Sequence, residues 1–234
     1  LANYLTLFNN FGDDLNPVIY DSNGAIIDSV FGVGAKDSVL GFAGSSFTFG
    51  GSTCEYTEGR AVINGFASAD DTTLINVVAH EIGHLFGLDH SQIDDVDQNI
   101  SLDDAPLMYP IAFRSTMTLA EDDIAIVRQM YPGPTVASTF GVIDGFLQAA
   151  NGTALQGGNV WARETTSGAL YSSISDLFEE GNGRFRMTLP AGTYSLHVGA
   201  VDDQFSGGSN VGPFSNGLGD ASFQPPFYNS GVRM

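Results

Sequence analysis

The chain has 234 residues and a net charge of −19, with 27 acidic side chains against one lysine and seven arginines. So few basic side chains exclude nucleic-acid binding as a main function, because phosphate contacts need lysine and arginine. Hydrophobic residues make up 43% of the chain, enough to bury a core, and no apolar run approaches the ~20 residues that span a membrane.

The first predicted element is a β-hairpin. Apolar residues 18–20 and 25–27 flank the sequence Asp21-Ser22-Asn23-Gly24. An Asn-Gly pair between apolar runs is typical of a tight hairpin turn. Asp21, Asn23 and Asp28 could also hold a calcium ion, but their spacing differs from that of an EF-hand loop. The turn is the favoured interpretation.

Two further strands are predicted at residues 47–49 and 60–63, where aromatic, β-branched and other apolar side chains gather. Cys54 lies between them and is the only cysteine, so the chain can form no internal disulfide. We expect Cys54 to be a buried free thiol.

A long helix is predicted to begin near Asp71 or Thr72, because the sequence DDTT at residues 70–73 offers N-cap side chains and acidic groups for the positive end of a helix. Apolar side chains then recur at helical spacing at Leu74, Val77, Val78, Ile82 and Leu85.

This helix carries the motif that is most informative about function, the sequence HEIGHLFGLDH at residues 80–90. His80 and His84 are four residues apart, so they project from the same helix face. Gly87 can adopt the positive φ that ends a helix, and the chain can then bring His90 to the same point. Three neutral imidazoles suit zinc and leave a fourth position open for water, which Glu81 can reach as general base.

Residues 92–106 are acidic and predict a solvated loop rather than a calcium site, whose candidate ligands would be Asp94, Asp95, Asp97, Asp103 and Asp104. A turn with Met108 and Pro110 follows. The last helix of this part is predicted at residues 121–130, ended by the sequence YPGP at residues 131–134. Asp122 and Asp123 lie in its first turn, where acidic residues stabilise any helix.

The motif at residues 80–90, the turn at residues 107–110 and the sequence LAEDDI at residues 119–124 resemble the matrixin branch of the metzincin zinc peptidases. The resemblance covers about residues 17–132. It implies an α+β catalytic domain with a mixed sheet, an active-site helix and a C-terminal helix. It also implies supporting roles around the zinc ion for Gly87, Met108, Pro110, Asp122 and Asp123: Met108 forms a floor below the metal, and the Asp pair ties the last helix to the Met108 turn.

The sequence departs from the matrixin pattern in two places. Ile111-Ala112 follow Pro110, where matrixins usually place a Tyr as the second residue, so the family's substrate preference does not carry over. The opening strand and long first helix of the family are also hard to find. We therefore expect a catalytic domain that lacks its N-terminal part, in a chain cut from a longer precursor.

An all-β sandwich is predicted at residues 136–205, with strands at 140–147, 159–163, 183–189 and 193–198 separated by turn residues. Their order resembles the prealbumin-like modules called carboxypeptidase regulatory-like domains, which implies a supporting or binding role. Residues 206–234 are rich in Gly, Ser and Pro and are expected to pack on this domain or to continue it.

The sequence thus predicts a matrixin-like domain at residues 1–135, followed by the β domain and the Gly-rich segment. The predicted function is a secreted zinc endopeptidase that cleaves proteins or peptides, with a structural calcium ion as an optional second metal. The alternative is a cell-surface or assembly protein that keeps the peptidase fold as a scaffold and binds through its β domain. The complete motif favours the enzyme, because a scaffold has no need of Glu81. A zinc hydrolase acting on other bonds is disfavoured by the extended motif.

Overall fold

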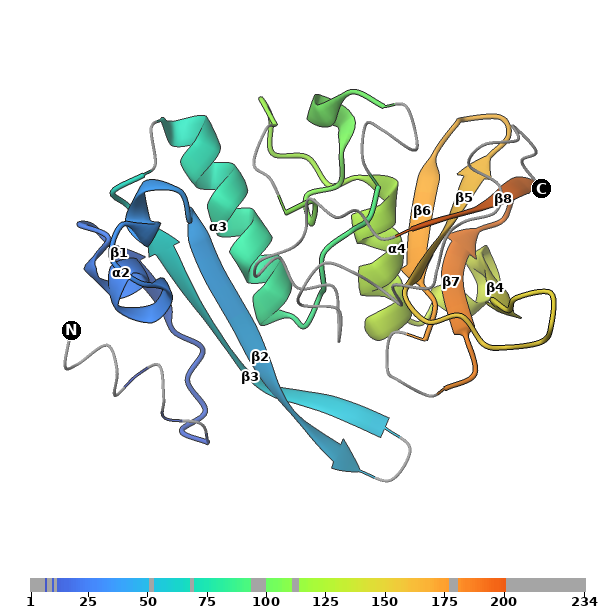
Figure 1. Cartoon of the computed structure of the whole chain (residues 1–234), viewed down its shortest axis with the longest axis horizontal. Coiled ribbons are helices and arrows are strands. Elements are labelled where there is room, and N and C mark those ends of the chain that lie inside the picture. Colours follow the sequence, from blue (N-terminus) through green and yellow to red (C-terminus); the bar gives the residue numbers. More distant parts are fainter. Residues whose placement is uncertain are drawn as a thin grey trace. The chain divides into compact units, whose positions relative to one another are not determined.

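The computed structural model describes residues 7, 10, 12–50, 53–67, 70–93, 100–110, 114–176 and 181–200. The chain forms two compact units. The first contains Leu1–Leu88 and Ala112–Thr118, and the second contains Asp89–Ile111 and Leu119–Met234. Figure 1 shows helices and strands in both units, so the predicted mixed α+β class is confirmed. Within the described residues, no helix combines the length and apolar character needed to cross a membrane.

The first unit contains a three-stranded sheet of mixed direction. Its strands are β1 (Val18–Asp21), β2 (Gly41–Gly50) and β3 (Thr53–Asn64). The central strand β3 pairs in parallel with β1 and antiparallel with β2, which places β2 at an edge. The strands predicted around residues 47–49 and 60–63 are confirmed by β2 and β3.

The predicted hairpin at residues 18–27 is wrong, because its second half forms helix α2 (Ala25–Phe31). The carboxylate of Asp21 accepts hydrogen bonds from the backbone N–H groups of Ile26 and Ile27, at 2.7 and 3.1 Å. These bonds satisfy N–H groups that have no partner inside a helix, so the turn starts a helix instead of a return strand. Ile26 and Ile27 are buried in a cluster with Val62, and the 3-10 helix η1 (Ala35–Asp37) follows.

The long helix α3 (Asp71–Leu85) packs against β2 and β3 (Figure 1). It begins where the sequence predicts, because the side chain of Asp70 accepts a 2.9 Å hydrogen bond from the backbone N–H of Thr73.

The second unit contains two small sheets and the helices that accompany them. One sheet pairs β4 (Phe140–Phe146) with β7 (Arg184–Pro190), and the other has the order β6-β5-β8. The strands of the second sheet are β5 (Gly158–Glu164), β6 (Leu170–Ile174) and β8 (Tyr194–Ala200). The predicted strands correspond to β4, β5, β7 and β8, whereas β6 was not predicted.

Helix α4 (Glu121–Met130) has the bounds that the sequence predicts, and it packs against β6 and β7. Ala125 of α4 lies in one hydrophobic core with side chains of β5, β6 and β7, namely Val160, Ala162, Tyr171, Met187 and Leu189. The short helices η2 (Leu102–Asp104) and α5 (Val136–Thr139) complete the unit. The boundaries predicted at residues 135 and 205, and the separate all-β domain between them, stay predictions.

Candidate metal centre

Helix α3 ends in a backbone arrangement that requires a glycine. The N–H of Gly87 donates to the carbonyl of His84, and the N–H of Leu88 donates to the carbonyl of Gly83. These two bonds form a Schellman motif, in which the residue after the helix has a positive φ. Gly87 has a φ of +87°, and a Cβ at this position would lie 2.4 Å from the Tyr56 ring. Both the backbone and the available space therefore restrict this position to glycine.

His80 and His84 extend from the same face of α3, as their spacing predicts. Their Nε2 atoms are 3.1 Å apart. Nδ1 of His84 lies 2.8 Å from the carbonyl oxygen of Leu88. Since a carbonyl oxygen only accepts, Nδ1 carries the proton, and the lone pair of His84 Nε2 is directed toward His80.

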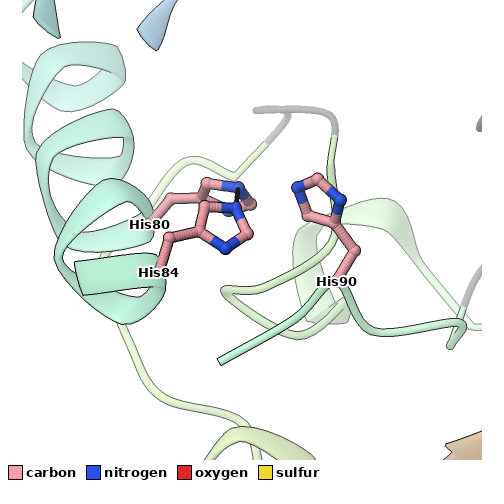
Figure 2. Close-up of side chains that lie close together, drawn as sticks. All are labelled: His80, His84 and His90. Atoms are coloured by element: carbon pink, nitrogen blue, oxygen red, sulfur yellow. Dashed lines mark hydrogen bonds between the residues drawn. The ribbon is translucent and has the colours of Figure 1, made fainter. Parts of the chain in front are cut away.

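His90 completes a group of three histidines. One ring nitrogen from each of His80, His84 and His90 can be chosen such that all three lie within 4.8 Å of one another. Figure 2 shows the rings of His80 and His84 on α3 and the ring of His90 turned toward them from the segment that follows the helix. Among the described residues, no other cluster of His, Cys, Asp or Glu has this metal-binding potential.

The donor set fits a zinc ion. Two imidazole nitrogens that bind one tetrahedral zinc at the usual bond length are about 3.3 Å apart, close to the observed separation of His80 and His84. Burial lowers the pKa of His84 to about 4, and the neighbouring His80 acts in the same direction. Both effects favour the neutral imidazole, which is the form that binds a metal.

The side chain of Glu81 is 5% exposed, and its Oε2 atom is buried without a hydrogen-bond partner among the described residues. Burial raises the pKa of Glu81 to about 8. A buried carboxylate oxygen with no donor is costly unless a bound molecule supplies one, so Glu81 has the character of a proton acceptor at a functional site. The carboxyl lies against Gly41 at the start of β2, where an added Cβ would be 2.7 Å from Oε1.

The turn that contains Met108 is tied to the start of α4 by Asp123. One oxygen of Asp123 accepts from the N–H groups of Leu107 and Ala120, both at 2.8 Å, and the other accepts from Met108 at 3.0 Å. Met108 is 1% exposed, and Pro110 ends the turn. These bonds hold the Met108 turn against the start of α4, and the roles of Asp123 and Met108 in supporting a bound metal stay predictions.

Asp122 makes different contacts from its neighbour. Its carboxylate accepts from the hydroxyl of Ser91 at 2.6 Å and from the backbone N–H of Ser172 at 2.7 Å. Burial raises its pKa to about 7, and the two serine donors oppose this shift. Asp122 thus contacts the residue that follows His90, not the Met108 turn.

Among the described residues, the aspartates predicted as calcium ligands form no metal-binding cluster. Asp21 accepts from backbone groups of α2, and Asp28 accepts from the N–H groups of Gly34 and Lys36. Asp94, Asp95 and Asp97 lie outside the described residues, as do the side-chain surroundings of Cys54. Calcium binding and the buried thiol therefore stay predictions.

Gly41 and Ser172 belong to the surroundings of the site but were not identified from the sequence. Gly41 stands 40 positions before Glu81, and Ser172 stands 50 positions after Asp122. A glycine or serine at such a distance carries no periodic or motif signal. Only the fold shows that these residues contact the proposed catalytic and supporting side chains.

Comparison with protein families finds a match that covers the histidine motif. The family model for matrixin matches residues 27–132, from α2 to the end of α4. No curated protein and no solved structure gives a significant match to the chain. Residues 27–132 are therefore similar to the matrixins, and this similarity together with the three histidines suggests a zinc-dependent metalloprotease.

Proposed function

We propose that this protein is a secreted zinc endopeptidase that hydrolyses peptide bonds in proteins or peptides. The observation that carries the proposal is the combination of three converging imidazoles with the buried carboxylate of Glu81 on the same helix as two of them. A structural role for α3 would not require a buried, unpartnered carboxylate oxygen next to two histidines.

His80, His84 and His90 would hold the zinc ion, which when bound polarises a carbonyl group and makes a neighbouring water more acidic. Glu81 supplies the proton transfer. Its carboxylate takes a proton from the attacking water and then gives it to the amine that leaves.

The edge strand β2 offers a place for an extended substrate. Among the described strands, β2 pairs with β3 alone, so its other edge can form backbone hydrogen bonds with a peptide. Gly41, the first residue of β2, contacts the carboxyl of Glu81. A peptide that pairs with this end of β2 would therefore pass close to the proposed general base.

Replacing Glu81 by Gln tests the mechanism directly. Glu81→Gln keeps the size of the side chain and all three histidines, so zinc content should stay at about one ion per chain. Hydrolysis of a peptide library should fall by about 10²–10⁴-fold, because the general base is lost. Glu55→Gln makes the same chemical change at an exposed position on β3 and should leave activity intact.

Unchanged hydrolysis by the Glu81→Gln variant would rule out this mechanism. If the unmodified protein binds zinc but shows no chelator-sensitive cleavage of diverse peptides, the endopeptidase proposal fails and the scaffold alternative is favoured. The same assay on peptides of known sequence would define the preferred cleavage site.

We base the proposed location outside the cell on the similarity of residues 27–132 to matrixins. Structural calcium and contacts with a cell surface or matrix through the β region belong to the same proposal. Secretion is tested by finding the protein in culture medium of the producing cells, and calcium by its effect on the midpoint of thermal unfolding.

A further inference from the structure

The two residues that follow His90 are held firmly within the second unit. The backbone N–H of Ser91 donates to the carbonyl of Met108 at 2.9 Å, and its hydroxyl donates to Asp122 at 2.6 Å. The carbonyl of Gln92 accepts from the side-chain amide of Asn159 at 3.1 Å. Ser91, Gln92, Asp122 and Asn159 are each 1% exposed, so water does not compete for these bonds.

Two residues of the C-terminal strands, Asn159 and Ser172, take part in these hydrogen bonds. Asn159 belongs to β5, and Ser172, in the neighbouring strand β6, donates to Asp122 from its backbone N–H at 2.7 Å and from its hydroxyl at 3.3 Å. Oδ2 of Asp122 therefore accepts from the hydroxyls of both Ser91 and Ser172, and Oδ1 accepts from the backbone N–H of Ser172. Gln92 thus bonds to a residue 67 positions later in the sequence, and Ser91 is linked through Asp122 to a residue 81 positions later.

We infer that Asn159 and Ser172 of the C-terminal strands are positioning residues for the third proposed metal ligand, His90. The inference rests on the proposed zinc site. His90 lies in a segment without helix or strand structure, so no regular pattern of backbone hydrogen bonds fixes its position. The direct bond to Gln92, and the bond to Ser91 through Asp122, hold the backbone immediately after it. Groups that orient metal ligands in this way commonly change metal affinity when they are removed.

A substitution in these strands also changes their packing against α4, which is a different effect from positioning His90. A bond elsewhere on α4 allows the two effects to be measured separately. Thr188 of β7 donates to Gln129 of α4 at 3.1 Å, which also connects a C-terminal strand to that helix. This bond involves neither residue 91 nor residue 92. Thr188→Val removes it while keeping the shape of the side chain, and it is the matched control.

The test measures the zinc affinity of the full chain by competition with a chelator. Five proteins are compared: the unmodified chain, Ser172→Ala, Ser172→Ala with Asn159→Ala, Ser172→Thr and Thr188→Val. Folding of each is monitored by circular dichroism, and urea unfolding is measured without zinc. Ser172→Ala keeps the backbone bond to Asp122, so this variant stays interpretable if the double variant is poorly folded. We expect a small loss of affinity in the single variant, a loss of about 10–100-fold in the double variant and none in the control. Ser172→Thr, which keeps the hydroxyl, should bind zinc like the unmodified chain.

Zinc affinity that is unchanged in both the single variant and a folded double variant overturns the inference. A loss of unfolding stability with unchanged zinc affinity also overturns it, because that result is expected from packing alone. If the unmodified chain binds no zinc, the proposed function fails and the inference fails with it. If the chain binds zinc in the expected order of affinities but cleaves no peptide, the inference is supported and only the endopeptidase proposal is overturned.

Discussion

At the scale of single residues, Gly41 limits where the carboxyl of Glu81 can lie. A Cβ at residue 41 would be 2.7 Å from Oε1 of Glu81 and 2.9 Å from its Cγ, so Gly41→Ala should displace that side chain. Displacing a catalytic group by about 1 Å can lower turnover about 100-fold, and we expect such a fall in kcat with zinc content unchanged. Gly44→Ala is the control, because a Cβ there meets nothing within 4 Å. Wild-type kcat in Gly41→Ala would contradict the assigned role of the Glu81 carboxyl.

Gly87 allows a second prediction at this scale. Gly87→Ala places a side chain at a φ of +87° and 2.4 Å from the Tyr56 ring. Gly152 has a φ of +85° with open space around it, so Gly152→Ala measures the backbone strain alone. That strain is about 1–2 kcal/mol. Gly87→Ala should destabilise the zinc-free protein by more than Gly152→Ala in urea unfolding and should also weaken zinc binding. Equal effects of the two changes would show that the contact with Tyr56 is unimportant.

Among the elements, the Met108 turn and the start of α4 are joined by the carboxylate of Asp123. Asp123 accepts three backbone N–H groups, and an amide in its place would set an NH₂ group against at least one of these donors. Asp123→Asn should therefore lower the free energy of unfolding by about 1.5–3 kcal/mol in urea titrations of the zinc-free protein. Glu121→Gln, at an exposed position two residues earlier in the same helix, should change the free energy of unfolding by less than about 0.5 kcal/mol. If both substitutions have the same small effect, the tie does not stabilise the fold.

Elements with strong local signals were predictable, and those that depend on distant partners were not. Helices α3 and α4 have clear starts and apolar spacing, so their bounds follow from the sequence. The hairpin predicted at residues 18–27 is wrong because Asp21, which precedes the Asn-Gly pair, accepts from the backbone N–H groups of Ile26 and Ile27. The segment after the pair therefore begins helix α2 and not a second strand. Strand β6 contains two serines in five residues and is stabilised by pairing with β5, which no local pattern reveals. The three histidines converge as their spacing predicts, whereas the partners of Asp122 come from the fold alone.

At the scale of the whole molecule, each compact unit combines segments that are separated in the sequence. The second unit joins residues 89–111 and helix α4 with the strands that follow residue 139. Ala125 of α4 shares a core with β5, β6 and β7, and Asp122 shares hydrogen bonds with β6. A cut at residue 135 would expose this core and remove the partner of a buried carboxylate. Within the second unit, helix α4 therefore shares a hydrophobic core and buried hydrogen bonds with the strands that follow it.

The same buried carboxylate makes stability depend on pH. Burial raises the pKa of Asp122 from 3.8 to about 7 in the folded protein, and Asp123 acts in the same direction. Because the folded protein holds this proton more tightly than the unfolded chain, the stabilising contribution is complete below about pH 4 and is lost as the pH rises through about 7. Between pH 5 and pH 8, the zinc-free protein should lose on the order of 2 kcal/mol more unfolding free energy than Asp122→Asn, which cannot titrate. Urea unfolding of both proteins at the two pH values gives this difference directly, since other titrating groups contribute equally to each. Parallel pH dependence in the two proteins would show that Asp122 is ionised throughout, held in that state by Ser91 and Ser172.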